Sequence, residues 1–149
     1  MPRFLRALVV LVLAFTFGSI LRAVLPTVQT GQWVSSGPLA QARSGTAAVL
    51  LPDGRVMITG GDVNGSPSSS VEMFNADGSI SSAAPMETAR SGHSALLLTS
   101  GEVLVTGGRT SGGEATNSAE LYDPFEDVWL PAPAMLNARS GHTTLQLPN

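Results

Sequence analysis

The chain repeats itself over most of its length, and this repetition limits the possible folds more than any other feature of the sequence. The tetrapeptide Ala-Arg-Ser-Gly occurs three times, and its arginines recur at intervals of 47 and 49 residues at Arg43, Arg90 and Arg139. Two further segments return in the same order at spacings of 47 and 48 residues: 57–61 as 104–108, and 70–74 as 118–122. A period of about 48 residues predicts copies of one small structural unit that stack on each other.

Each unit has a pattern of strands and turns with no room for an ordinary helix. In the first unit an apolar run at 46–51 is followed by Pro-Asp-Gly, a hairpin signal, and by a return strand at 55–59. The other expected strands are at 70–74 and Ile80 in the first unit, and at 94–98, 102–106, 118–122 and 128–130 in the second. We therefore expect a four-stranded antiparallel sheet from each unit.

The apolar runs at 47–51 and 95–98 are continuous rather than alternating. Such runs are typical of strands that are buried on both faces of a sheet. Burial on both faces requires a neighbouring sheet on each side, and radial stacking of four-stranded blades supplies this in β-propellers.

These residues resemble the kelch repeat, in which Arg-x-Gly-His precedes the first strand, Gly-Gly ends the second, and Glu-x-Tyr-Asp-Pro and Trp follow. The second unit carries the pattern closely at Arg90, Gly92, His93, Gly107, Gly108, Glu120, Tyr122, Asp123, Pro124, Trp129 and Met135. The first unit has Thr46 for the histidine, Phe74-Asn75 for Tyr-Asp and Ile80 for the tryptophan. The resemblance covers residues 33–149.

The resemblance implies an all-β fold of four-stranded antiparallel kelch blades, forming a partial β-propeller over residues 26–149. Its expected parts are an outer strand near Trp33, blades at 43–84 and 90–133, and the first strand of a third blade at 138–149. Propellers typically contain about four to eight blades. We therefore expect a truncated chain, with open blade edges that are prone to self-association.

The first 25 residues differ in character from the rest. Arg3 and Arg6 precede fifteen largely apolar residues at 7–21, and Pro26 ends the segment. A positive start before such a run is typical of a signal peptide, whereas continuation through Leu25 would make a membrane anchor; a buried core helix is the third alternative. Both of the first two interpretations predict a hydrophobic helix and a secreted, extracytoplasmic or membrane-anchored protein.

Charge and composition exclude several classes of function. The chain has no cysteine, which excludes disulfides, thiolate metal sites and a cysteine nucleophile. Residues 26–149 carry eleven carboxylates and five arginines, a net charge of −6. This acidic excess argues against nucleic-acid binding, and it leaves the N-terminal segment as the only expected contact with a membrane.

The polar residues of the repeat are expected to be structural, because equivalent positions in successive blades are not brought together as a catalytic group would be. This set comprises Arg43, Gly60, Gly61, Arg90, His93, Gly107, Gly108, Glu120, Tyr122, Trp129, Arg139 and His142. We predict that each guanidinium binds loop carbonyls between blades. No catalytic, metal or cofactor site is predicted.

The loops at 62–69 and 109–117 differ between the units, and loops on a constant scaffold are where recognition is usually carried. The candidate binding residues are Asp62, Asn64, Ser66, Arg109, Thr110 and Glu114. The function predicted first is an exported binding module for a protein or carbohydrate ligand. The alternatives are a fragment of an extracellular enzyme resembling galactose oxidase, with its catalytic residues elsewhere, and a truncated product without function.

Overall fold

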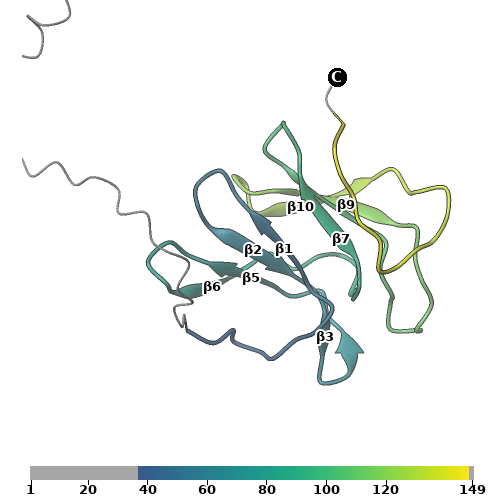
Figure 1. Cartoon of the computed structure of the whole chain (residues 1–149), viewed down its shortest axis with the longest axis horizontal. Coiled ribbons are helices and arrows are strands. Elements are labelled where there is room, and N and C mark those ends of the chain that lie inside the picture. The colour runs from purple at the N-terminus through teal and green to yellow at the C-terminus, as the bar shows by residue number, and fades with distance from the viewer. Residues whose placement is uncertain (1–36, 148–149) are drawn as a thin grey trace, which may run out of the picture. The chain divides into compact units, whose positions relative to one another are not determined.

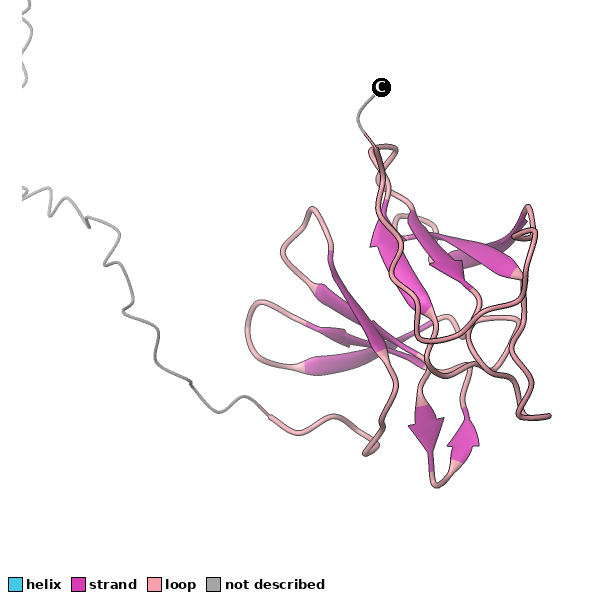
Figure 2. Ribbon diagram, turned by 45° about the vertical axis from the view of Figure 1, so that its right-hand side comes forward, coloured by secondary structure: helices cyan, strands magenta, loops and turns pink. Residues whose placement is uncertain are grey.

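The structure is a computed structural model, and it describes residues 37–147. The hydrophobic helix expected at 1–25 and the outer strand expected near Trp33 lie outside the described residues. The described part is built from strands and loops without a helix, so it contains no helix that could cross a membrane (Figures 1 and 2). The all-β prediction is confirmed for these residues.

Two four-stranded antiparallel sheets form the fold, one from each predicted unit. The first sheet has the order β1 (Ala47–Leu50), β2 (Val56–Thr59), β5 (Val71–Phe74) and β6 (Ile80–Ala83). The second sheet has the order β7 (Ser94–Leu97), β8 (Val103–Thr106), β9 (Ala119–Asp123) and β10 (Val128–Ala132). Every strand lies within a few residues of its predicted position.

This strand order gives each sheet two different ends. The turns at 52–54 and 75–79, with their copies at 100–101 and 124–127, lie at one end, which we call the turn rim. The loops at 62–69 and 109–117, together with the linker between the sheets, lie at the other end, which we call the loop rim.

The loop at 62–69 is more regular than its polar sequence suggests. It forms a ribbon of two short strands, β3 (Asp62–Val63) and β4 (Ser66–Pro67), which is the short pair at the bottom of Figure 2. Asn64 and Gly65 join the strands with φ values of 51° and 79°. Positive φ at both central residues is the geometry of a tight hairpin, and Asn-Gly is the sequence that favours it.

The hydrophobic core lies between the two sheets, with β1 beside β7 (Figure 1). Its most buried members are Met57, Val71 and Met73 from the first sheet and Val103, Val105 and Tyr122 from the second. The expectation of burial on both faces is therefore only half met within the described residues. Leu50 on the other face of the first sheet is 64% exposed, and Leu130 on the other face of the second is 50% exposed.

Residues 138–147, expected to begin a third blade, form no strand. They are held by the second sheet: Gly141 N–H donates to Gly92 O at 2.7 Å, and Thr144 N–H donates to Ser94 Oγ at 3.0 Å. An antiparallel ladder needs a second strand, and no described residue pairs with this segment as β8 pairs with β7. The third blade stays a prediction.

Candidate functional site

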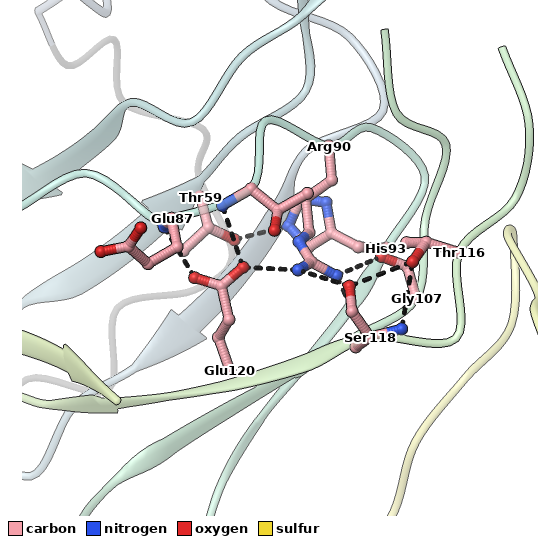
Figure 3. A network of polar contacts seen from close by, with 9 residues as sticks. Thr59, Glu87, Arg90, His93, Gly107, Thr116, Ser118 and Glu120 are labelled. Atoms are coloured by element: carbon pink, nitrogen blue, oxygen red, sulfur yellow. Dashed lines mark hydrogen bonds and ion pairs between the residues drawn. The ribbon is translucent and has the colours of Figure 1, made fainter. Parts of the chain in front are cut away.

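A buried arginine organises the second sheet at the loop rim. Arg90 precedes β7 and is 0% exposed. Its Nη1 donates to the carbonyl of Gly107 at 2.7 Å and to that of Ser118 at 3.2 Å, while Nη2 donates to Ser118 Oγ at 3.1 Å and to the Glu120 carboxylate (Figure 3). The guanidinium thus joins the ends of β8 and β9 to the start of β7.

The Glu120 carboxylate has further donors besides the arginine. The backbone N–H groups of Glu87 and Thr88 donate to it at 2.7 and 3.1 Å, so it also holds the linker that arrives from the first sheet. A buried ion pair is tolerated when hydrogen bonds satisfy both charges, and these contacts satisfy the carboxylate. The cluster therefore offers no free charge to a ligand.

The first sheet contains the same cluster. Arg43 donates to the carbonyls of Gly60 and Ser70 at 2.8 and 3.3 Å and forms an ion pair with Glu72, whose carboxylate also accepts Ala40 N–H at 2.8 Å.

The predicted contacts between arginines and loop carbonyls exist, but the carbonyls belong to the arginine's own repeat rather than to a neighbouring blade. The partnership with glutamate was missed, although both residues recur at the repeat spacing. Arg139, the third copy, is exposed.

Each histidine connects one repeat to the repeat before it. His93 Nε2 lies 2.7 Å from Thr59 Oγ1, across the interface between the sheets, and His142 Nε2 lies 3.0 Å from Thr106 Oγ1. Burial, with a smaller contribution from the charge of Arg90, lowers the pKa of His93 to about 4. Burial also lowers the pKa of His142. Both imidazoles are therefore neutral at pH 7, and no group of three potential metal ligands occurs among residues 37–147.

The double glycines permit this close contact between repeats. A β-carbon on Gly60 would lie 2.5 Å from the carbonyl oxygen of Arg90 and 2.8 Å from the His93 ring. Gly107 meets the corresponding atoms of Arg139 and His142 in the same way. Gly61 and Gly108 donate their N–H groups to the carbonyls of Arg90 and Arg139, both at 2.9 Å.

The aromatic pair of the second sheet holds the two sheets together at the outer strand. Tyr122 and Trp129 lie opposite each other in the ladder with ring centroids 5.0 Å apart. Trp129 Nε1 donates to the carbonyl of Ala84 at 2.8 Å, and Tyr122 OH donates to Asp127 at 2.7 Å. Burial raises the pKa of Tyr122 above its ordinary value. Tyr122 belongs to the core between the sheets, and Trp129 packs against that core.

The two candidate binding loops lie next to each other on the loop rim. Ser44 bridges to Asp62 at the start of the first loop, and Ser91 bridges to Arg109 at the start of the second. Ser68, at the end of the first loop, pairs with Arg90, the residue before Ser91.

Beyond these anchors the loop tips are open to solvent. Asn64, Ser66 and Glu114 are exposed, as is Arg109, while Asp62 and Thr110 are half-buried. The second loop is also a hairpin: Arg109 bridges to Ala115, and Thr110 N–H donates to the carbonyl of Glu114 at 3.1 Å. It has this single bridge and a longer turn, where the first loop has two short strands joined by Asn64 and Gly65.

A cleft on the turn rim has no counterpart in the sequence predictions. It has a volume of about 420 Å³ and lies between the turns of the two sheets. Its lining includes Asp53, Glu102, Asp123 and Phe125. The sequence showed these residues only as separate turns, because their meeting depends on how the sheets pack.

The geometry of the second sheet agrees with a comparison against protein families. Residues 89–136 match the family model described as the kelch motif. The chain contains a kelch repeat. The match covers the second sheet and its linkers. The first sheet lies outside the match, but it has the same strand order and the same arginine–glutamate cluster, so the two sheets are two copies of one structural unit. No match was found among curated proteins.

Proposed function

We propose that this chain is an exported interaction module that binds a partner protein through the loop rim. Kelch blades supply a constant scaffold, and here the scaffold arginine and glutamate of each of the two sheets are buried and form an ion pair. The variable part consists of the β3–β4 ribbon and the loop at 109–117, which differ in both sequence and conformation. The observation that carries the proposal is that these two loops begin from equivalent backbone bridges, Ser44 to Asp62 and Ser91 to Arg109, yet differ in sequence from Asp62 and Arg109 onward and end in exposed tips.

A protein fits this rim better than a small molecule as the ligand. The loop tips are two exposed hairpins of different turn length, and the cleft of about 420 Å³ described above lies at the opposite end of the sheets, on the turn rim. Projecting loops of unlike shape bind across a surface, as in other scaffolds that carry recognition loops. The export part of the proposal depends on the charge and apolar pattern of residues 1–25.

Single cysteines test both parts of the proposal, because the natural chain has none. Ser66→Cys and Glu114→Cys place a thiol on the loop rim, while Ala76→Cys and Phe125→Cys place one on the turn rim of the same two sheets. All four positions are exposed. A membrane-impermeant, thiol-reactive photo-crosslinker added to intact cells should label all four variants and should join only the two loop-rim variants to a partner protein.

The labelling result tests export, and the crosslinking result tests binding through the loop rim. Labelling only after lysis contradicts export. Labelling in intact cells with adducts at the turn rim alone, equally at both rims, or at neither rim contradicts binding through the loops.

A further inference from the structure

The two sheets present apolar rows on the faces that point away from each other. In the first sheet the ladder aligns Leu50, Val56, Phe74 and Ile80 across all four strands. In the second sheet it aligns Leu96, Leu104, Leu121 and Leu130. We call these rows the first open face and the second open face. All eight side chains are exposed or half-buried.

Each open face is the repeat copy of a face that is buried inside the chain. In the first sheet the row Val49, Met57, Met73 and Ser81 faces the second sheet; its first three members are buried there, whereas Ser81 at the outer strand is exposed. The copy of this row one repeat later is the second open face. The second sheet buries the row Leu97, Val103, Tyr122 and Trp129, and its copy one repeat earlier is the first open face.

The exposed fractions of the side chains differ strongly between the buried rows and the open faces. Met57 and Val103 are 0% exposed in the buried rows, whereas Leu130 and Leu50 on the open faces are 50% and 64% exposed. An exposed apolar sheet face of this kind marks an interaction surface. The interface between the two sheets shows what such a surface accepts, namely a sheet of the same design.

We propose that the second open face binds the first open face of a second copy of this chain, in the arrangement that the two sheets already have within one chain. The contact is head-to-tail, because it joins two different faces, and repeating it closes a ring when the rotation allows. Propellers contain roughly four to eight blades, so copies of two sheets each would close as about two to four chains.

The inner edge of the second open face is already occupied. Gly92 N–H donates to Gly45 O where β7 meets the first sheet, and Gly141 N–H donates to Gly92 O in the same manner. Residues 138–147 thus take the place that β1 of a second copy would need. They have no ladder, whereas β1 pairs with β2 over four residues. We therefore expect the C-terminal segment to be displaced when the copies associate.

Sedimentation velocity of the full chain in a mild non-ionic detergent tests the proposal. Leu130→Asp disables the second open face and Leu50→Asp disables the first, at positions exposed enough for the variants to fold. Wild-type chain should sediment as an oligomer, and each variant alone as a monomer. An equal mixture of the two variants should form dimers and nothing larger, because one intact pair of faces remains. Leu136→Asp, at a linker residue that is 97% exposed, is the matched control and should leave association unchanged.

Circular dichroism of both variants checks that they are folded. A monomeric wild type would overturn the proposal, since the open faces would then be covered by another protein or by residues outside the described part. Oligomers that survive both substitutions would place the contact elsewhere, with the apolar N-terminal segment as the first suspect. A mixture that stays monomeric would rule out the head-to-tail arrangement.

Discussion

At the scale of single residues, the buried charged and titratable side chains of the two sheets bond to strands and linkers of the described part. Arg90 and Glu120 are both buried, and the groups that bond to Arg90 Nη1, Arg90 Nη2 and the Glu120 carboxylate mark where a strand or linker begins. His93 is held neutral between the sheets. Arg90 Nε and His93 Nδ1 have no hydrogen-bond partner among the described residues, but both nitrogens are buried and a ligand could reach them only by breaking the surrounding contacts.

The buried state of His93 predicts a dependence of stability on pH. An unfolded histidine has a pKa near 6.5, whereas folding lowers the pKa of His93 to about 4. Between these values the unfolded chain holds more protons, so stability falls as the pH drops from about 6.5 to about 4 and levels off below. The loss attributable to His93 should be up to about 3 kcal/mol.

Urea unfolding of the wild type and of His93→Gln at pH 7.5, 5.5 and 4.5 measures this contribution. Glutamine keeps a hydrogen-bonding group near Thr59 but does not titrate, so the variant should lose less stability over this range. His142→Gln is the matched control and should remove less of the slope, because His142 is less buried. Equal slopes for the wild type and His93→Gln would show that His93 is not the group responsible.

At the scale of elements, the sheets follow from local sequence more directly than the contacts between them. The Asp-Gly turn, the short apolar runs and the repeat spacing predicted all eight strands of the two sheets. The β3–β4 ribbon was missed because its sequence is polar, although Asn64-Gly65 carried a hairpin signal. The arginine–glutamate pairs were missed because each one joins residues about 30 positions apart in sequence.

Two glycines of the first sheet, Gly54 and Gly60, are expected to differ in how much stability the protein loses when each is replaced by alanine. Gly60 and Gly54 both have positive φ, at +54° and +87°, but an added β-carbon meets the Arg90 carbonyl at 2.5 Å at Gly60 and nothing within 4 Å at Gly54. Gly54→Ala should therefore cost only the conformational penalty of about 1–2 kcal/mol. Gly60→Ala should cost more, because the second sheet must also move away. Urea midpoints of the two variants check this, and equal midpoints would mean that the sheets are not in close contact at Gly60.

At the scale of the whole described part, neither sheet has a core of its own. The buried residues of both sheets form one cluster between them, so each sheet depends on its neighbour as repeats in stacked proteins do. Residues 138–147 show the same dependence: Leu145 and Leu147 are 67% and 73% exposed, whereas their repeat copies Val49 and Leu51 are 8% and 2% exposed.

Because the core is shared, a substitution that destabilises the first sheet should also lower the stability of the second sheet against unfolding. Met57→Ala removes a fully buried side chain from the first sheet and should destabilise the protein by about 2–5 kcal/mol. In a Trp33→Phe background, fluorescence reports Trp129 of the second sheet alone, because the chain has two tryptophans. The Trp129 transition in urea should shift by the full amount. Leu136→Ala, at an exposed site, serves as the control; an unshifted Trp129 transition would mean that the sheets unfold independently.

The repeat, the eight strands of the two sheets and the turns between them could be predicted from the amino-acid sequence, because each of these depends on a local pattern or on the repeat spacing. The structural role of the shared polar residues stays a prediction. Three features become visible only in the folded chain: the carboxylate that each buried arginine binds, the proximity of the two variable loops, and the sheet faces that stay uncovered. Those features arise from groups far apart in sequence that packing brings together, and no local pattern records the distances between them.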